Sequence, residues 1–269
     1  MRRRLPLLAL VGVSLLVVFT PHRHPPGDAH AHDSGEHGHD HGHEHADTPA
    51  PDAPDAPDAP APEALKPPEP YADLVSRIQS KRGPKALEDA SRAPAEVERR
   101  MVRDMESLFD RWYGTTWGLG SPQTKVPQEG KVNCGMFVAR TLVDAGFVIK
   151  AGKLQRQPAE LIIKSLAPKS TITRWRNEPI DRFIKDMKGM GPGLYVIGLD
   201  FHVGYVLVRE DLDVRFIHAS YVTHTVLDEP AATASPIITS KYRVVGKIMQ
   251  PEMLRRWAGR ERIAVLGSW

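Results

Sequence analysis

Cysteine is almost absent from this chain of 269 residues, which contains only Cys134. A single cysteine cannot form a disulfide within the chain, so no disulfide framework holds the fold. Long apolar runs are scarce too. The run from Leu5 to Phe19 follows three arginines at positions 2–4; it has the length of a signal-peptide core and is short for a membrane span. The sequence therefore predicts an exported protein, either periplasmic or held facing the periplasm by an inner-membrane anchor at residues 5–19.

Positive charge is in only small excess over the whole chain, with 36 Lys and Arg against 33 Asp and Glu. The segment before residue 66 is acidic, so the excess of positive charge belongs to the rest of the chain. A spread-out basic excess favours anionic surroundings such as cell-wall polymer or a membrane surface. It is not interleaved with aromatic residues, which make up 7% of the chain, so nucleic acid is not expected as a partner.

The segment from residue 21 to 70 contains no run of large apolar side chains and cannot bury a core. Nine of the twelve histidines lie there, the densest series being His37, His39, His41, His43 and His45. Flexible imidazoles at this density chelate Zn²⁺, Cu²⁺ or Ni²⁺, either incidentally or as a selected function. Three Pro-Asp-Ala units then predict a semi-rigid polyproline spacer at residues 47–70.

Residues 71–269 show two different periodicities. Residues 71–83, 94–112 and 177–193 carry apolar side chains every three or four positions, which predicts helices, and a short helix is expected at 251–259. Residues 193–200, 201–210, 213–221 and 240–249 are β-branched and aromatic runs between turn residues, which predicts strands. Helices followed by an antiparallel sheet indicate an α+β fold.

The chemistry of this part centres on Cys134, which begins an amphipathic helical pattern that stops at Gly146. Strands joined near residues 210–213 would bring His202 and His218 to neighbouring positions. A helix N-terminus favours a thiolate, and an adjacent imidazole can take the thiol proton. Backbone N–H groups at Cys134 and after it could stabilise an oxyanion. Taken singly, a cysteine such as Cys134 is more often a packing residue than a nucleophile, and the same reasoning makes His218 a structural histidine and His224 a solvated one.

Four motifs, in order, give these residues a context: "YGTTWGLGS" at 113–121, "NCGMFV" at 133–138, "HVGYVLV" at 202–208 and "FIHAS" at 216–220. With a final strand at "YRVVGKI", residues 242–248, the chain resembles the NlpC-type family of cell-wall cysteine peptidases. The resemblance implies a papain-like fold in which the nucleophile helix packs on an antiparallel sheet. It implies that Cys134 is the nucleophile, His202 the general base and His218 the orienting group.

Three positions near the motifs depart from the family pattern. Trp117 stands where the family has a tyrosine, Asn133 where it has an aspartate and Gly135 where it has a serine. We expect these three residues to contact the substrate or its oxyanion. A long segment around residues 154–186 also separates Cys134 from His202. These differences bear on substrate preference, because all three residue types of the triad are present.

The predicted organisation is then a signal peptide or anchor at 1–20, a His-rich disordered tail at 21–46, a Pro-rich linker at 47–70, a helical extension at 71–112 and an NlpC-like catalytic domain at 113–269. The resemblance implies hydrolysis of amide bonds in peptidoglycan stem peptides, with no cofactor required and no metal in the domain. The same triad acting on another amide or ester is one alternative, and two alternatives of other classes stay open. One is a periplasmic metal-binding protein that uses its His-rich tail. The other is a non-catalytic module that binds the cell wall or a partner through the same fold.

Overall fold

A computed structural model describes residues 69–120 and 123–268, so the predictions for the signal segment, the His-rich tail and most of the Pro-rich linker lie outside the described residues. The helices are α1 Tyr71–Ser80, α2 Pro84–Arg92, α3 Pro94–Trp112, α4 Cys134–Asp144, α5 Ala151–Leu154, α6 Ala159–Leu166, α7 Ile180–Met190, α8 Ser235–Thr239 and α9 Pro251–Ala258, with a 3₁₀ turn at Lys169–Thr171. The strands are β1 Thr116–Trp117, β2 Lys131–Val132, β3 Val148–Ile149, β4 Ile172–Arg176, β5 Gly193–Gly198, β6 Val203–Val208, β7 Val214–Ser220, β8 Thr225–Pro230, β9 Tyr242–Lys247 and β10 Arg262–Ile263.

Eight of these strands form one sheet in the order β2-β1-β8-β7-β6-β5-β9-β4. The α+β prediction is confirmed, but the sheet is mixed, because β1 and β2 pair in parallel while its other pairs are antiparallel. A parallel pair needs a connection longer than a hairpin turn, and residues 118–130 supply it. Strands β3 and β10 form a separate parallel pair.

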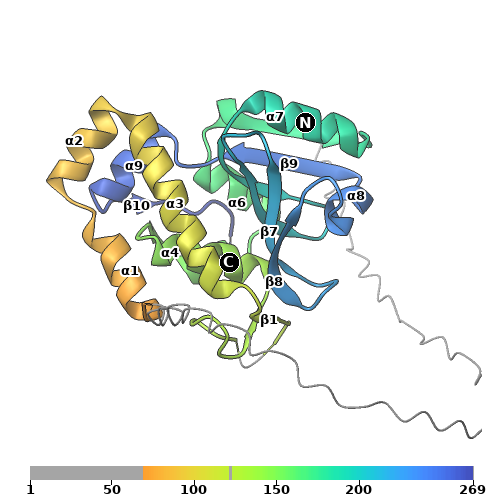
Figure 1. Ribbon diagram of the computed structural model, residues 1–269, viewed down its shortest axis with the longest axis horizontal. Coiled ribbons are helices and arrows are strands. Elements are labelled where there is room, and N and C mark those ends of the chain that lie inside the picture. Colours follow the sequence, from red (N-terminus) through yellow and green to blue (C-terminus); the bar gives the residue numbers. More distant parts are fainter. Residues whose placement is uncertain (1–68, 121–122, 269) are drawn as a thin grey trace, which may run out of the picture. The chain divides into compact units, whose positions relative to one another are not determined.

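Both faces of the sheet are covered, as its alternating side chains require (Figure 1). On β5, Leu194 and Val196 join the core that includes α1, α3, α4, α6 and α9, while Tyr195 and Ile197 join a second core beneath α7 and α8. Every residue of β5 and β6 is buried. The near-continuous apolar runs of these strands follow from this two-sided burial.

Helix α4 is fixed to β6 by hydrogen bonds as well as by packing. The Tyr205 hydroxyl on β6 donates to the Val138 carbonyl at 3.0 Å and lies 2.8 Å from the Thr141 hydroxyl. The helix ends before Gly146, which adopts a φ of +99° that a residue with a side chain rarely takes. The nucleophile candidate at the first position of α4 is thus held at a defined distance from the sheet.

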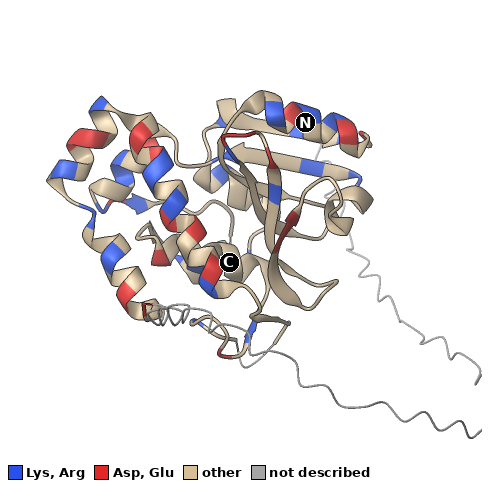
Figure 2. Cartoon of the chain, viewed as in Figure 1, with Lys and Arg blue, Asp and Glu red and all other residues tan. Residues whose placement is uncertain are grey.

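The helices at 71–112 share the core of α4. The Tyr71 hydroxyl donates to the Asp144 carboxylate at 2.6 Å and accepts from the Trp112 indole at 2.9 Å. Arg140 forms an ion pair with the same carboxylate at 2.7 Å. Basic and acidic side chains are interspersed on α2, α3 and α7 (Figure 2). Within the described ranges, no helix has the length and apolar character needed to cross a membrane.

Candidate active site

Cys134 lies in a cleft of about 570 Å³ together with His202. Asn133, Gly135, Val203 and residues of α6, the β5–β6 turn and β9 also line the cleft. The backbone N–H groups of Val203, Gly135 and Cys134 act to lower the pKa of the thiol. The predicted nucleophile and the predicted base therefore share one cavity, at the point where α4 begins and β6 begins.

Asn133 has a local structural reason to precede the cysteine. Its side-chain oxygen accepts the Met136 backbone N–H at 2.9 Å, so Asn133 is the N-cap of α4. The cap satisfies one of the free amide donors of the first turn. Cys134 and Gly135 themselves line the cleft, and their N–H groups, in the first turn of α4, are candidates to bind an oxyanion.

Gly135 is a glycine because another segment lies against it. A Cβ at this position would overlap the Gln155 carbonyl oxygen, which belongs to the loop after α5. The serine common in the family would not fit without a shift of that backbone. The segment inserted between Cys134 and His202 thus forms one wall of the cleft, through Gln155, Gln157 and α6.

His202 and His218 meet directly, as the strand pairing predicted. The His202 Nε2 lies 2.8 Å from the His218 Nδ1. Gly204, two residues after His202, leaves the space that His218 occupies, since a Cβ there would come within 2.9 Å of the His218 Cβ. His202 lines the cleft, whereas His218 is fully buried behind it and stacks on Phe216 with ring centroids 3.9 Å apart.

Glu229 on β8 extends this chain and was not among the predicted site residues. Its Oε1 lies 2.8 Å from the His218 Nε2. A carboxylate can only accept, so the His218 Nε2 carries a proton and the neutral ring presents Nδ1 as an acceptor. The His202 Nε2 must then donate to it. The tautomer that results leaves the His202 Nδ1 with a free lone pair, which is the property a general base needs.

The pKa shifts of the two histidines and of the thiol all favour the neutral form of each group. Burial, followed by the charge of His218, lowers the pKa of His202 to about 3. Burial also lowers the pKa of His218, against the opposing effect of Glu229. Burial raises the pKa of the Cys134 thiol, and nearby backbone N–H groups oppose that rise without cancelling it. This direction disfavours the thiolate expected at the helix N-terminus.

Trp117 is placed beside the cleft residues rather than among them. Its ring lies 6.5 Å from Tyr221 and 5.7 Å from His224, centroid to centroid, and it is not part of the cleft lining. Its indole N–H is buried without a hydrogen-bond partner. The role expected for Trp117 in substrate contact stays a prediction.

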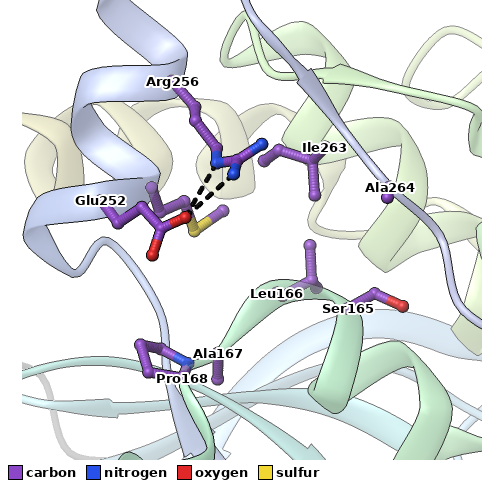
Figure 3. A pocket seen from close by; sticks show the side chains of 9 residues that line it. Ser165, Leu166, Ala167, Pro168, Glu252, Arg256, Ile263 and Ala264 are labelled. Atoms are coloured by element: carbon purple, nitrogen blue, oxygen red, sulfur yellow. Dashed lines mark hydrogen bonds and ion pairs between the residues drawn. The ribbon is translucent and has the colours of Figure 1, made fainter.

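A second hollow, of about 220 Å³, lies between α6, α9 and β10 (Figure 3). It contains an ion pair between Arg256 and Glu252 at 2.9 Å and the hydroxyl of Ser165. That hydroxyl donates to the Leu161 carbonyl and accepts from the Leu266 N–H. No histidine lines this hollow, so its serine has no base to activate it.

Metal ligation has no site among residues 69–120 and 123–268, where no group of three or more His, Cys, Asp or Glu side chains is arranged to hold an ion. The histidines predicted to chelate metal, at positions 37–45, lie outside these ranges.

Comparison with known proteins gives one structural likeness to report. No protein-family model and no curated protein matches the sequence. A solved structure of an N-acetylmuramoyl-L-alanine amidase from Bacteroides uniformis ATCC 8492 is similar over 55% of this chain and 99% of its own, at 12% sequence identity and a TM-score of 0.31. A likeness at that score does not establish a shared fold or activity. The resemblance to the NlpC-type family stays a prediction based on its motifs.

Proposed function

We propose that this protein is an exported cysteine hydrolase that cleaves amide bonds in the stem peptides of peptidoglycan. The observation that carries the chemistry is the hydrogen-bonded series His202, His218 and Glu229, which begins at a residue that lines the same cleft as Cys134. The choice of substrate is supported by the motif resemblance and by the basic charge of the residues after position 66.

In the proposed reaction, the Cys134 sulfur attacks the acyl carbon while its proton moves to the His202 Nδ1. The backbone N–H groups at Cys134 and Gly135 stabilise the oxyanion. The C–N bond then breaks and the leaving amine takes the proton from His202. Water attacks the thioester while His202 accepts a proton from it. The C–S bond then breaks, and His202 returns that proton to the sulfur, which restores the thiol and the neutral imidazole.

Glu229 supports the charge that appears on His202 during this reaction. When His202 becomes an imidazolium, its Nε2–H donates to His218, which in turn donates to a negative carboxylate. The resting pair is neutral, so charge separation develops only as the substrate carbonyl accepts electrons. This is general-base catalysis, and it does not require a pre-formed thiolate.

Digestion of purified peptidoglycan by the full chain, with products identified by mass spectrometry, tests the proposal. We expect new amine and carboxyl ends in stem peptides, and a loss of at least about 1000-fold in Cys134→Ala. Ser165→Ala, which removes the hydroxyl of the second hollow, is the matched control and should retain activity. Undiminished cleavage by Cys134→Ala would refute the mechanism, and wall binding without products would favour the non-catalytic alternative.

A further inference from the structure

The two most exposed large apolar side chains of the described residues both line the catalytic cleft. Phe201 is 95% exposed and Leu119 is 73% exposed. Tyr221, 39% exposed, lies next to the cleft residue His202, with the two ring centroids 5.3 Å apart. We call Leu119, Phe201 and Tyr221 the apolar rim. Three separate segments contribute it, so its position around Cys134 is a property of the fold.

Phe201 lies in the β5–β6 turn, where hydrogen bonds fix the backbone on both sides of it. The Leu199 N–H donates to the His202 carbonyl at 2.8 Å, which closes the β5–β6 turn. The Asp200 carboxylate accepts the backbone N–H groups of Lys241 and Tyr242, at 2.8 and 3.2 Å. These bonds fix the backbone on both sides of Phe201. The exposed phenyl ring is therefore presented from a defined position in the lining of the cleft.

Leu119 is positioned in a comparable way. The Gly118 N–H before it donates to the Val132 carbonyl at 3.1 Å, two residues from Cys134. The Trp117 N–H donates to the His224 carbonyl at 2.9 Å, which ties β1 to the turn that carries Tyr221. The segments that carry Leu119 and Tyr221 are thus connected through the backbone hydrogen bonds of β1.

Among the described residues, the side chains that line the cleft include no cation that could form an ion pair with an anionic substrate. No Lys or Arg lines the cleft. Of its two carboxylates, Glu160 is paired with Arg174 and Lys164, at 2.7 and 2.9 Å, and Asp200 is occupied by backbone N–H groups. A substrate gains no ion pair from the lining, whereas an apolar substrate group gains the contact surface of the rim.

Resting on the proposed function, we propose that the apolar rim is a substrate subsite that binds an uncharged aliphatic or aromatic group within a few bonds of the acyl carbon attacked by Cys134. Such a group covers Phe201 and Leu119 when the acyl carbon reaches the thiol. The rim thereby selects among amide substrates by their apolar content rather than by their charge.

N-alkylmaleimides test this subsite without requiring turnover, because Cys134 is the only thiol in the chain. In the addition, the sulfur bonds to a ring carbon and a proton goes to the neighbouring carbon, with no leaving group. The ratio of the rates for N-octylmaleimide and N-ethylmaleimide is measured at pH 8 on the full chain and on glutathione. A fully covered methylene favours binding by roughly fourfold, so we expect the ratio on the full chain to exceed the glutathione ratio by more than about tenfold.

Phe201→Ser and Leu119→Ser should bring this ratio down toward that of glutathione. Ile238→Ser, which removes an apolar side chain 45% exposed on α8 and outside the cleft, should leave it unchanged. Equal ratios in the wild type and glutathione would overturn the subsite. So would adsorption to phosphatidylcholine vesicles that depends on Phe201 without any chain-length preference, because the rim would then be a lipid contact. Chain-length preference without any hydrolysis of peptidoglycan would instead count against the proposed function alone.

Discussion

Glu229 is the residue whose charge decides how His202 can act. It lies two hydrogen bonds from His202 and touches neither the thiol nor the cleft lining. We expect Glu229→Gln to lower kcat by about 10- to 1000-fold with KM unchanged, since the amide keeps the shape but loses the charge that stabilises the imidazolium. Steady-state kinetics measure the loss, and nitrogen NMR of His202 reports the tautomer.

Asp228 provides a matched control for this substitution. It precedes Glu229 on β8 and pairs with Arg215 at 2.9 Å, away from the histidines. Asp228→Asn should leave kcat within about twofold, and Glu229→Asp should recover part of the activity. If Glu229→Gln matches the wild type in kcat and in tautomer, Glu229 has no part in positioning His202.

The protonation state of Cys134 can be tested separately. Burial raises the pKa of its thiol above the ordinary value, so the thiolate fraction is small at pH 7. The rate of alkylation by iodoacetamide should rise about tenfold per pH unit between pH 7 and 9. A thiolate–imidazolium pair formed at rest would instead react at a rate that hardly changes between pH 5 and 8, and that result would exclude the neutral resting pair.

Asn133 stabilises a whole secondary-structure element, because its side chain caps α4. Asn133→Ala removes the acceptor of the Met136 N–H and should lower the free energy of unfolding by about 1 kcal/mol. Asn133→Asp keeps an N-cap acceptor, and its negative charge suits a helix N-terminus. Urea unfolding of both variants measures the difference. Equal losses in the two variants would show that capping is not what Asn133 contributes.

The long helices and strands could be predicted from the sequence, because each buries a regular stripe of apolar side chains. Helix α3 and helix α7 follow from apolar residues at helical spacing, and β5, β6, β7 and β9 follow from dense β-branched runs. The two-residue strands β1 and β2 carry too few residues for any period to show. Strand β8, "TVLDEP", is half exposed and contains two acidic residues and a proline, so local propensity gave no indication of it.

In the candidate site too, contacts between sequence neighbours could be predicted, and contacts that depend on the whole sheet could not. The meeting of His202 with His218 follows from two neighbouring strands and the turn between them. Glu229 reaches His218 only because β8 pairs with β7 in the register that places Phe216 opposite Glu229. That register depends on the whole sheet, and no local pattern reports it. The raised pKa of Cys134 could not be predicted from the sequence either, since it results from burial in the folded chain.

At the scale of the whole molecule, the neutral histidines make folding depend on pH. The folded-state pKa values of His202 and His218 lie below the ordinary value of 6.5. As pH falls below 6.5, the unfolded chain binds protons that the folded chain does not. The contribution of the two neutral histidines to the free energy of unfolding is therefore fully present above pH 6.5. It is lost on acidification, by up to about 1.4 kcal/mol per pH unit for each histidine.

Urea unfolding between pH 6.5 and 5, above the range of ordinary carboxyl groups, measures this loss. Substituting His202 with Asn removes one of the two titrating groups, so the variant should lose stability about half as steeply over this range. A free energy of unfolding that is flat from pH 7 to 5 in the wild type would contradict the account of two buried neutral imidazoles.

The central claim is that Cys134 forms a covalent acyl-enzyme with the help of His202. The most direct measurement is the release of p-nitrophenolate from p-nitrophenyl acetate in the first moments after mixing with the full chain. A covalent mechanism predicts a burst of about one p-nitrophenolate per chain, acetylation of the peptide that contains Cys134, and loss of both in Cys134→Ala and His202→Ala. A wild-type chain that releases p-nitrophenolate no faster than Cys134→Ala, with no adduct on the thiol, would contradict it.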